Sequence, residues 1–519
     1  MASSFFPSLS KFKSDFSSNR ISPVWTEVVA DVETPTSAFA KLGNEPPAFL
    51  LESAEQNDLV GRLSFVGCGC QLKVVAHGHD VCFTNAAGKA VNYKSETDPL
   101  KELEILFSEL RCGRHAELEG FWGGAVGYLA YDTIRWVEPT VGAAPSDSLG
   151  VPDLFFWVPE VILVFDHHRR SIKLVATVLP QDLGKNLSGG LAEVFSKITG
   201  QSGGTAEEVY TLAQKRIGEV QQRLSQAVSC PPLPTQFDGE MPDARSNTTR
   251  EEYHGMVERG KEYIRAGDIF QFVPSQRFSA EFGGDALDLY RALRFINPSP
   301  YMFCLRCEPG FSIVGSSPEV HVRLTDRLVE IRPIAGTRKR GADATEDKAL
   351  AEDLLADPKE RAEHLMLVDL ARNDVGRIAD FASVEVTDFM TVEHYSHVMH
   401  IVSHVTGKLA GGRNAFDVMR ATFPAGTVSG SPKVRAMQII NEVEKNKRCI
   451  YAGAVGYFRF DGDLDSCIAL RTVVLKDGKA HVQAGGGVVA DSTPEGEYQE
   501  SVNKAKAALR AVGLAKTLK

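Results

Sequence analysis

One predicted helix start in this 519-residue chain carries more carboxylate than a helix needs. In the stretch "DPKERAE", Asp357 suits the N-cap, Pro358 suits the first helical position, and Glu360 lies three residues past the cap. Glu363 follows one turn later, so Glu360 and Glu363 stack on one face of the helix. Such a pair can complement the helix dipole, for about 0.3–1 kcal/mol at an exposed site, or bind a cation.

A second predicted helix repeats this arrangement near the end of the chain. In "STPEGEYQESVNK", the cap is Ser492 or Thr493, and then Glu497 and Glu500 stand at i and i+3. Lys504 lies one turn beyond Glu500, where an exposed ion pair would contribute about 0.3–0.5 kcal/mol. For either helix alone, dipole complementation is the simpler explanation. Two such pairs together favour a Mg²⁺ site, because Mg²⁺ binds oxygen ligands and needs one or two carboxylates besides water and substrate oxygens.

Three further features can face a ligand or serve the protein core. Glycines 485–487 in "QAGGGVV" can aim backbone N–H groups at an anion, although an ordinary glycine-rich turn explains them equally well. Arg471 interrupts the apolar run "SCIALRTVVL", so a buried guanidinium there needs a carboxylate from a ligand or from the protein. His400 alternates with apolar neighbours in "HVMHIVSHV", and a hydrogen-bonded core histidine is the default interpretation.

Composition indicates a globular protein without a nucleic-acid partner. The chain is 43% hydrophobic and 24% charged, and its formal net charge is 57 − 67 = −10. No block of five basic residues occurs, and phosphate neutralisation needs clustered Lys and Arg. The nine cysteines are scattered, and the Cys-x-x-Cys at 304–307 has no second pair to complete a zinc site, so we expect reduced thiols.

The sequence also argues against a membrane partner. No run reaches the roughly 18 apolar residues of a membrane span. The N-terminal stretch lacks the apolar core of a signal peptide. Its Ser and Lys content weakly resembles a transit peptide, but Arg is sparse and Asp15 intrudes. We therefore expect a cytoplasmic protein.

Turn signals and hydrophobic patterns divide the chain into two predicted domains. Residues 184–208, rich in Gly and Ser, and residues 230–247, rich in Pro, are typical of linkers. We expect a tail without fixed structure at 1–18, an N-terminal domain at 19–245, and a C-terminal domain at 246–519. Strand patterns joined by Asp-Gly turns indicate antiparallel hairpins, and helical patterns mix with them. The predicted class is α+β with large antiparallel sheets.

Six motifs occur in a fixed order between about residues 246 and 510: "IRPIAGTRKRG", "DPKERAEHLMLVDLARND", "ATFPAGTVSGSPKVRAM", "YAGAVGYF", "IALRT" and "QAGGGVVADSTPEGEYQES". Together they resemble the chorismate-utilising enzyme family, most closely its anthranilate synthase component I branch. The N-terminal half matches more thinly, chiefly through "FLLESAE". The resemblance implies the fold of that family, in which two large, mainly antiparallel sheets pack together and are flanked by helices.

The resemblance implies a site for chorismate, a cyclohexadiene dicarboxylate. Glu363 and Glu500 match the Mg²⁺ ligands of the family, and Glu360 and Glu497 match acids that support those ligands. The positions that match substrate contacts are Gly336, Thr337, Tyr451, Arg471, Gly485, Gly486 and Gly487. The positions that match groups near the reacting atoms are His400 for the elimination step, Thr427 beside the 4-hydroxyl, Glu319 as general acid for that leaving group, Gln271 beside the nucleophile, and Lys504 as a carboxylate contact.

Two positions indicate the branch of the family. Isochorismate-type relatives carry a lysine base where this chain has Gln271, and aminodeoxychorismate synthases commonly carry a lysine where it has Ala335. Gln271 cannot activate water, and Ala335 cannot form a covalent adduct. The resemblance therefore implies attack of ammonia at C2 and loss of pyruvate to give anthranilate, the first committed step of tryptophan biosynthesis. Because the sequence contains no glutamine amidotransferase domain, we expect a hetero-oligomer in which a separate subunit delivers ammonia.

Two segments resemble the tryptophan feedback site of the family. The matching residues are Glu52 and Ser53 in "LLES" and Asn297, Pro300, Tyr301 and Met302 in "NPSPYM". An amino-acid inhibitor needs an acid or carbonyl groups for its ammonium and an apolar slot for its ring. A strand end and a proline-containing turn would explain the two segments separately. We expect tryptophan to favour a state with lower chorismate affinity.

Two alternative functions stay open on the sequence alone. Within the family, the alternative is an aminodeoxychorismate synthase or an isochorismate/salicylate-type synthase. Outside enzymes, the alternative is a subunit that senses an amino acid without catalysis. Retention of both glutamate pairs, His400 and Arg471 argues against that second alternative.

Overall fold

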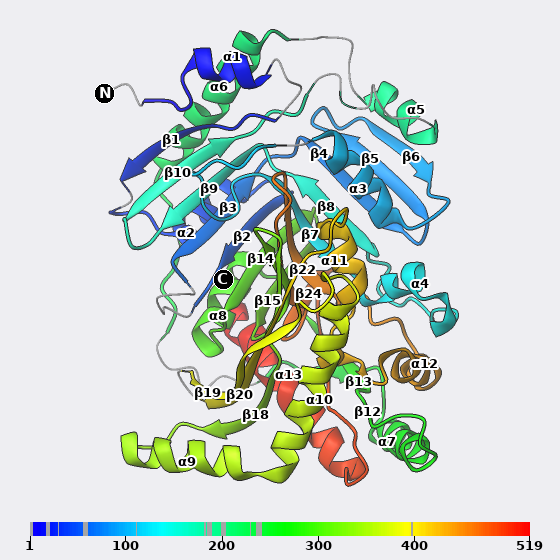
Figure 1. Ribbon diagram of the computed structural model, residues 1–519. Helices are drawn as coiled ribbons and strands as arrows, with labels where there is room; N and C mark the ends of the chain where they lie inside the picture. The colour runs from blue at the N-terminus through cyan, green and yellow to red at the C-terminus, as the bar shows by residue number, and fades with distance from the viewer. Residues whose placement is uncertain are drawn as a thin grey trace.

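The computed structural model describes residues 4–16, 21–29, 31–54, 61–110, 112–180, 183, 189–198, 204–228, 230–234, 241–395 and 398–518. Parts of the predicted tail and of the predicted linker at 184–208 lie outside these residues. Within them, two large sheets are accompanied by helices (Figure 1). No helix in the described part of the chain is both long enough and apolar enough to cross a membrane.

The first sheet is antiparallel and draws strands from both halves of the sequence. Met302 pairs with Glu52 in this sheet, which joins the N-terminal strands to the C-terminal ones. In spatial order its strands are β1 (Val24–Val29), β10 (Ser171–Ala176), β9 (Val161–Asp166), β3 (Leu63–Cys68), β2 (Ala48–Glu52), β14 (Tyr301–Glu308), β15 (Phe311–Ser317), β24 (Thr472–Lys476), β25 (Lys479–Gly485), β13 (Ser275–Glu281) and β11 (Arg245–Ser246).

The second sheet is built in the same way. Val455 of β22 pairs with Tyr128 of β7, so strands on either side of the predicted boundary at 245/246 share both sheets. In spatial order its strands are β18 (Ile334–Lys339), β20 (Val398–Lys408), β17 (Leu328–Ile331), β16 (Val320–Thr325), β23 (Leu464–Ile468), β22 (Ala454–Arg459), β7 (Gly124–Leu129), β8 (Leu154–Val158), β4 (Leu72–His77), β5 (Asp80–Asn85) and β6 (Ala90–Lys94), and β19 (Glu385–His394) also pairs with β20.

A layer of buried aromatic and aliphatic side chains fills the space between the sheets. Phe49 of β2 contacts Trp157 of β8 with ring centroids 6.1 Å apart, and Phe311 of β15 contacts Phe155 of β8 at 6.4 Å. Alternate residues of each strand point to this layer because side chains of a strand alternate between its two faces. The packing of two mainly antiparallel sheets confirms the predicted α+β class.

Helices pack on the outer faces of the sheets. The outer core of the first sheet includes α2 (Pro35–Leu42), α6 (Ala206–Leu224), α8 (Ala286–Ile296) and α13 (Pro494–Lys516). The outer core of the second includes α3 (Pro99–Glu109), α5 (Gly189–Ile198), α10 (Pro358–Gly376) and α11 (Ala415–Thr422). One smaller apolar cluster contains α9 (Ala344–Ala356). Another contains α7 (Arg250–Arg265) and α12 (Lys433–Val443), which lie around the paired short strands β12 (Gln271–Phe272) and β21 (Gly430–Ser431). The short helix α4 spans Ile134–Val137.

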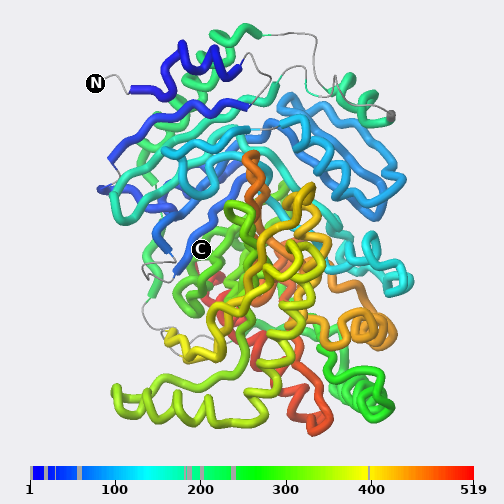
Figure 2. The backbone as a smooth tube through the Cα atoms, in the orientation of Figure 1, coloured from blue at the N-terminus to red at the C-terminus, as the bar shows by residue number. Residues whose placement is uncertain are grey.

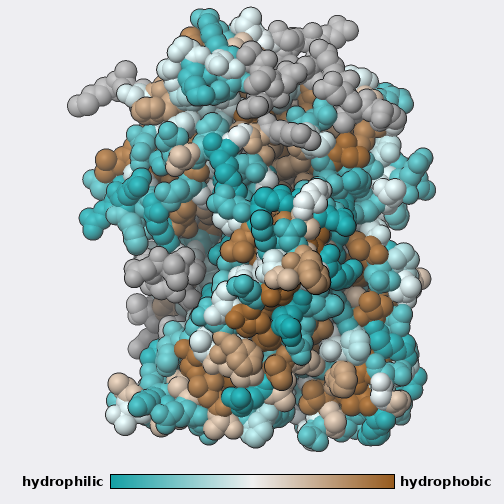
Figure 3. All heavy atoms as spheres, in the orientation of Figure 1, coloured by the Kyte–Doolittle hydropathy of each residue, from teal (hydrophilic) through white to brown (hydrophobic). Residues whose placement is uncertain are grey.

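The tube drawing in Figure 2 shows where the two halves of the sequence lie in the molecule. The blue and cyan N-terminal strands occupy the upper part of the molecule, and the green to red segments form the lower part (Figure 2). The face seen in Figure 3 is mostly hydrophilic, with apolar side chains in scattered groups. The sequence-distant segments around residues 271, 363, 427 and 500 all belong to the lower part, where the candidate site lies.

The N-terminal segment is packed over its described residues, 4–16. Helix α1 (Leu9–Phe16) buries Phe12 against Tyr210 of α6, with ring centroids 5.1 Å apart. Phe5 and Phe16 also pack against the same core. Three phenylalanines on a short segment give it enough apolar surface to stay bound.

We predict that Gly127→Ala in β7 destabilises the protein strongly. A Cβ at this position would lie 1.9 Å from the backbone oxygen of Phe155 in β8, and a backbone atom within a sheet cannot move aside. The free energy of unfolding, measured by urea denaturation, should fall by about 3 kcal/mol. Gly218→Ala in α6 is the control, because no atom lies within 4 Å and alanine should stabilise the helix by roughly 0.5–1 kcal/mol. Equal midpoints for the two variants would contradict the prediction.

Candidate active site

A cavity of about 550 Å³ lies where the starts of α10 and α13 meet the ends of several strands. Gly486 does not line it directly but lies beside Glu497 of its wall. The other residues predicted to contact chorismate or Mg²⁺, or to lie near the reacting atoms, all line this cavity: Gln271, Glu319, Gly336, Thr337, Glu360, Glu363, His400, Thr427, Tyr451, Arg471, Gly485, Gly487, Glu497, Glu500 and Lys504.

Helix α10 begins as the sequence predicts and presents its glutamates to the cavity. The side chain of Asp357 accepts hydrogen bonds from two backbone N–H groups of the first turn. Arg338 of β18 forms an ion pair with Glu360 at 3.3 Å. Glu363 lies one turn deeper, where the side-chain amide of Gln271 donates a hydrogen bond to it at 3.4 Å. Burial and the neighbouring charge of Glu360 raise the pKa of Glu363.

Helix α13 presents the second pair, and Thr493 caps its first turn. Lys504 forms an ion pair with Glu500 at 2.7 Å, with both side chains about half exposed. Ser492 donates a hydrogen bond to one oxygen of Glu497 at 2.7 Å. Its other oxygen, Oε2, is buried and has no hydrogen-bond partner among the described residues. Burial, with a smaller contribution from the like charge of Glu500, raises the pKa of Glu497.

These carboxylates fit a Mg²⁺ site that takes part of its coordination from water and substrate. Within the described ranges, no group of three or more His, Cys, Asp or Glu side chains is arranged to hold a metal ion by itself. Mg²⁺ in proteins usually keeps several waters and binds one or two carboxylates together with substrate oxygens. The predicted ligands Glu363 and Glu500 lie on one cavity with the unpartnered oxygen of Glu497, and carboxylate oxygens are donors of the kind that such a site needs.

Arg471 places a buried positive charge at the cavity. Burial lowers the pKa of its guanidinium, and its Nη1 donates a hydrogen bond to the side chain of Asn297 at 3.2 Å. Among the described residues, no carboxylate lies within 4.0 Å of it, so the protein acid that could have explained a strand arginine does not occur there. Nearby, burial raises the pKa of Tyr451 to about 12, and the backbone of Gly485 hydrogen-bonds to its hydroxyl. A ligand carboxylate would complete this end of the cavity.

A neutral acid faces the cavity at Glu319. Thr427 donates a hydrogen bond to its Oε1 at 2.7 Å, and the side chain is 6% exposed. Burial raises the pKa of Glu319 to about 8, although Thr427 and the charge of Lys504 oppose the shift. The carboxyl group is therefore protonated near neutral pH and can donate a proton.

Hydrogen bonds at Nδ1 fix the orientation of the His400 ring. Its Nδ1 lies 2.8 Å from the carbonyl oxygen of Gly336 and 3.1 Å from the hydroxyl of Thr337. Because a carbonyl accepts only, Nδ1 carries the proton and Nε2 carries the lone pair in the neutral ring. Burial lowers the pKa of His400, which favours this neutral form. Instead of a histidine closed within the core, the structure has one that borders the cavity.

Two glycines at the end of β25 permit close approach of acidic and amide groups. A Cβ on Gly486 would lie 2.7 Å from Oε2 of Glu497, and a Cβ on Gly487 would lie 2.4 Å from the amide nitrogen of Gln271. Any larger residue would push these side chains out of place. The glycine-rich segment is therefore part of the cavity wall and more than an ordinary turn.

The predicted tryptophan segments lie side by side in the first sheet. Glu52 and Met302 are cross-strand neighbours, and Glu52, 7% exposed, forms an ion pair with Arg294. Ser53 follows directly, and the adjacent backbone N–H of residue 54 bonds to the carbonyl of Ser299. Tyr301 instead directs its hydroxyl to Asp465, and with Pro300 it lines a second cavity of about 280 Å³. The predicted assignment of these residues to tryptophan stays a prediction.

Sequence reasoning missed two contributions to the cavity. Asn297, assigned to the feedback segment, also holds Arg471, and no local pattern signals a contact between residues 174 positions apart. Lys359 also lines the cavity, and its place in the first turn between Pro358 and Glu360 could have indicated this.

We predict that Glu319 lowers the stability of the protein as pH rises from about 4.5 to about 8. The unfolded chain ionises this carboxyl near its ordinary pKa of 4.5, whereas the folded protein keeps it protonated up to about pH 8. Its stabilisation is therefore fully present below the unfolded pKa and is lost as pH rises through the folded pKa. Compared with Glu319→Gln, the wild-type free energy of unfolding should fall across this window by on the order of a few kcal/mol. Parallel pH curves from urea denaturation would contradict this.

Comparison with known proteins agrees with this cavity. The family described as "chorismate binding enzyme" matches residues 46–510. Anthranilate synthase component 1 of Pseudomonas putida is 44% identical over 96% of both chains, and that of Aquifex aeolicus (strain VF5) is 45% identical over 95% of both.

Solved structures show the same likeness. The crystal structure of anthranilate synthase component I from Streptococcus pneumoniae TIGR4 superposes with a TM-score of 0.71 and 36% identity, covering 93% of this chain and 99% of that one. The isochorismate synthase MenF of Escherichia coli, 18% identical with a TM-score of 0.67 over 98% of this chain and 100% of that one, shares the fold. The predicted resemblance is confirmed, and the chain belongs to the chorismate-binding enzyme family.

Proposed function

We propose that this chain forms anthranilate and pyruvate from chorismate and ammonia in a Mg²⁺-dependent reaction, the first committed step of tryptophan biosynthesis. The observation that carries the proposal is the convergence of both glutamate pairs, the unpaired Arg471 and the protonated Glu319 on one cavity. The names of the relatives at 44–45% identity support the same reaction.

Binding of the substrate follows from the charges of the cavity wall. Arg471 would pair with one carboxylate of chorismate, and the phenol of Tyr451 would donate to the same group. Glu363 and Glu500 would hold Mg²⁺ at the ring carboxylate, with Glu360 and Glu497 orienting its waters. When bound there, Mg²⁺ supplies a Lewis acid that neutralises this carboxylate and withdraws electron density from the ring.

Proton transfer is assigned to two neutral groups. Glu319 donates its proton to the 4-hydroxyl, which leaves as water while the C–O bond breaks, and Thr427 keeps the carboxyl oriented. His400 has Nδ1 fixed by the carbonyl of Gly336, so Nε2 is the nitrogen that can accept the ring proton during loss of pyruvate.

The nucleophile is ammonia, because no base lies at the position that would activate water. Gln271 donates its amide to Glu363 and cannot remove a proton. A separate glutamine amidotransferase subunit would supply the ammonia and make the enzyme a hetero-oligomer. The component number in the names of the relatives supports a partner of this kind.

We expect anthranilate from a mixture of this chain, chorismate, Mg²⁺ and ammonium salt, detected by its fluorescence and its mass. Glutamine in place of ammonium should give no product until the partner subunit is added. EDTA should abolish activity, and Glu363→Gln and Glu500→Gln should each lower kcat/KM at least about 100-fold at fixed Mg²⁺.

Glu495→Gln is the matched control, because Glu495 lies in the first turn of the same helix but pairs with Arg250 on the surface. It should retain wild-type activity and Mg²⁺ dependence. Isochorismate or an aminodeoxychorismate as product would assign another branch of the family. No consumption of chorismate with or without Mg²⁺ would leave the non-catalytic sensor.

Tryptophan is expected to inhibit by raising the apparent KM for chorismate. Glu52, the buried acid of the feedback segment, is the group that would receive the tryptophan ammonium in place of Arg294. Glu52→Gln should raise the tryptophan concentration for half inhibition at least about 10-fold, judged from the ratio of inhibited to uninhibited activity. Glu27→Gln, on the outermost strand β1 of the same sheet, should leave that concentration unchanged. Full activity at saturating tryptophan would refute the feedback site.

A further inference from the structure

A fully buried ion pair lies directly behind the cavity wall. Arg448 is 2% exposed and Glu444 is 6% exposed, and they are joined by contacts of 2.9 Å from Nε and 2.6 Å from Nη2. Neither residue lines the cavity. The pair therefore cannot contact the substrate, and its effect on the site has to pass through its other partners.

Arg448 holds two cavity segments by their carbonyl oxygens. Its Nη1 donates to the carbonyl of Val428 at 2.8 Å, and its Nη2 donates to the carbonyl of Val273 at 2.5 Å. Val428 follows Thr427, and Val273 lies two residues after Gln271. A single guanidinium thus fixes the spacing between the segment that orients the acid Glu319 and the segment on the side of the nucleophile.

The same pair reaches the two segments at the carboxylate end. The guanidinium of Arg448 lies over the ring of Tyr451, 5.6 Å from its centroid, and over Tyr131 at 4.7 Å. Glu444 accepts hydrogen bonds from the backbone N–H of Ser275 at 2.8 Å and from its hydroxyl at 2.9 Å. Ser275 in turn pairs with Gly485, the first of the cavity glycines.

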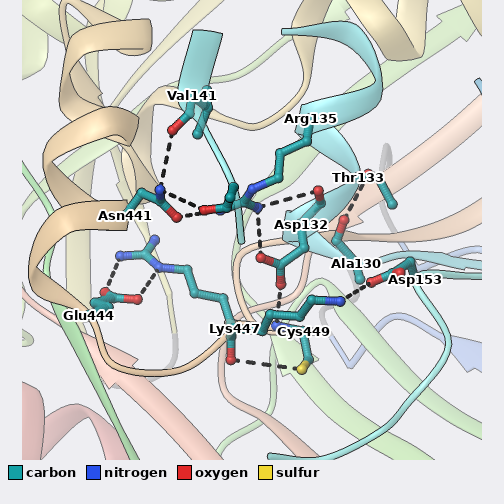
Figure 4. A network of polar contacts seen from close by, with 12 residues as sticks. Ala130, Asp132, Thr133, Arg135, Val141, Asp153, Asn441, Glu444, Lys447 and Cys449 are labelled. Atoms are coloured by element: carbon teal, nitrogen blue, oxygen red, sulfur yellow. Dashed lines mark hydrogen bonds and ion pairs between the residues drawn. The ribbon is translucent and has the colours of Figure 1, made fainter. Parts of the chain in front are cut away.

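The segment that carries the pair is itself held firmly from the far side. The backbone N–H of Cys449 donates to Asp132 at 2.9 Å, and Asp132 pairs with Arg135 at 2.8 Å. Arg135 donates to Asn441 at 2.6 Å, one turn before Glu444 (Figure 4). On its other side this frame is hydrogen-bonded to the segments at 273–275 and 428, contacts the ring of Tyr451, and reaches Gly485 through Ser275. It can therefore transmit position to all of them.

The ion pair between Arg448 and Glu444 contributes more to the placement of the cavity segments than to the stability of the fold. Removing two charges from water offsets most of their attraction, so a buried pair contributes little net stability. Directional contacts with several cavity segments, however, restrict the relative placement of reacting groups, and a misplacement of about 1 Å can reduce a rate roughly 100-fold.

We propose that Arg448 and Glu444 are a positioning pair that sets the spacing of the segments bearing Gln271, Thr427, Tyr451 and Gly485 around the substrate. This inference rests on the proposed function of the cavity. The pair acts through backbone carbonyls and a ring face, and takes no part in bond making or proton transfer.

The test compares this pair with a second partly buried pair that lies elsewhere. Lys41 and Glu33 are 12% and 13% exposed and contact each other at 2.6 Å, and Lys41 also donates a hydrogen bond to the distant carbonyl of Leu224 at 2.8 Å. The double variants Arg448→Met/Glu444→Gln and Lys41→Met/Glu33→Gln each remove both charges, so neither leaves an unpaired buried charge. Gln at 444 keeps an acceptor for Ser275.

The variant at Arg448 and Glu444 should lower kcat/KM at least about 100-fold, with a thermal midpoint no lower than that of the control variant. The control should keep kcat/KM within about twofold of wild type. Arg448→Lys keeps the charge but not the planar fork, so it should fold, lower kcat about 10-fold or more, and change KM for chorismate less. If the double variant does not fold, Arg448→Lys is compared with the control variant in its place.

Hydrogen exchange of the substrate-free protein separates this inference from the proposed function. Backbone amides at 271–275, 427–429 and 449–453 should exchange faster than in the wild type in the Arg448 variants. In the control variant their exchange rates should equal those of the wild type. A wild-type protein that makes no anthranilate refutes the proposed function, whereas the exchange result still decides the positioning role. Unchanged exchange in these segments, or a loss of kcat/KM equal to that of the control, would overturn the inference.

Discussion

The packing of the two sheets through one aromatic layer is the constraint on which the remainder of the molecule depends. Phe49, Phe155 and Trp157 lock the sheets face to face, and the strand ends then have fixed positions at the rim. Because both sheets interleave strands from the two halves of the sequence, neither half can complete a sheet alone. The cavity lies where strands of this framework end, and all of its lining residues fall between Gln271 and Lys504.

Burial then assigns different states to chemically similar acids. Glu319, sealed beside Thr427, stays protonated to about pH 8, whereas Glu500 shares its charge with Lys504 at the half-exposed edge. Burial and neighbouring carboxylates also raise the pKa of Glu363 and of Glu497. Acids of the same residue type thus lie in different surroundings within one cavity, and environment sets how readily each ionises.

Helix α8 connects the predicted feedback segment with the candidate active site. Asn297 ends α8 and accepts a hydrogen bond from Arg471, the group assigned to a chorismate carboxylate. Arg294 in the last turn of the same helix pairs with Glu52. A ligand that displaces Arg294 would act on a helix whose end holds Arg471, which gives the expected inhibition a short physical path.

The sequence by itself determined the local structure and the chemistry of single positions. The starts of α10 and α13, the stacked glutamates, the Asp-Gly hairpins and the α+β class follow from capping, periodicity and turn preferences, which act over a few residues. The family motifs added the roles of residues such as Glu319 and His400. The packing of the N-terminal segment around Phe12 does not follow from its local sequence, because that packing depends on contact with α6.

Tertiary structure alone decided the long-range relations. Arg471 contacts Asn297, and Arg448 bonds to Val273 and Val428, so these interactions join positions far apart in the sequence. That Arg471 has no carboxylate partner among the described residues is likewise visible only in the folded protein. The same holds for the protonated state of Glu319, since desolvation depends on everything that surrounds a group. Such properties depend on which segments are in contact in the folded protein, and local sequence patterns do not specify these long-range contacts.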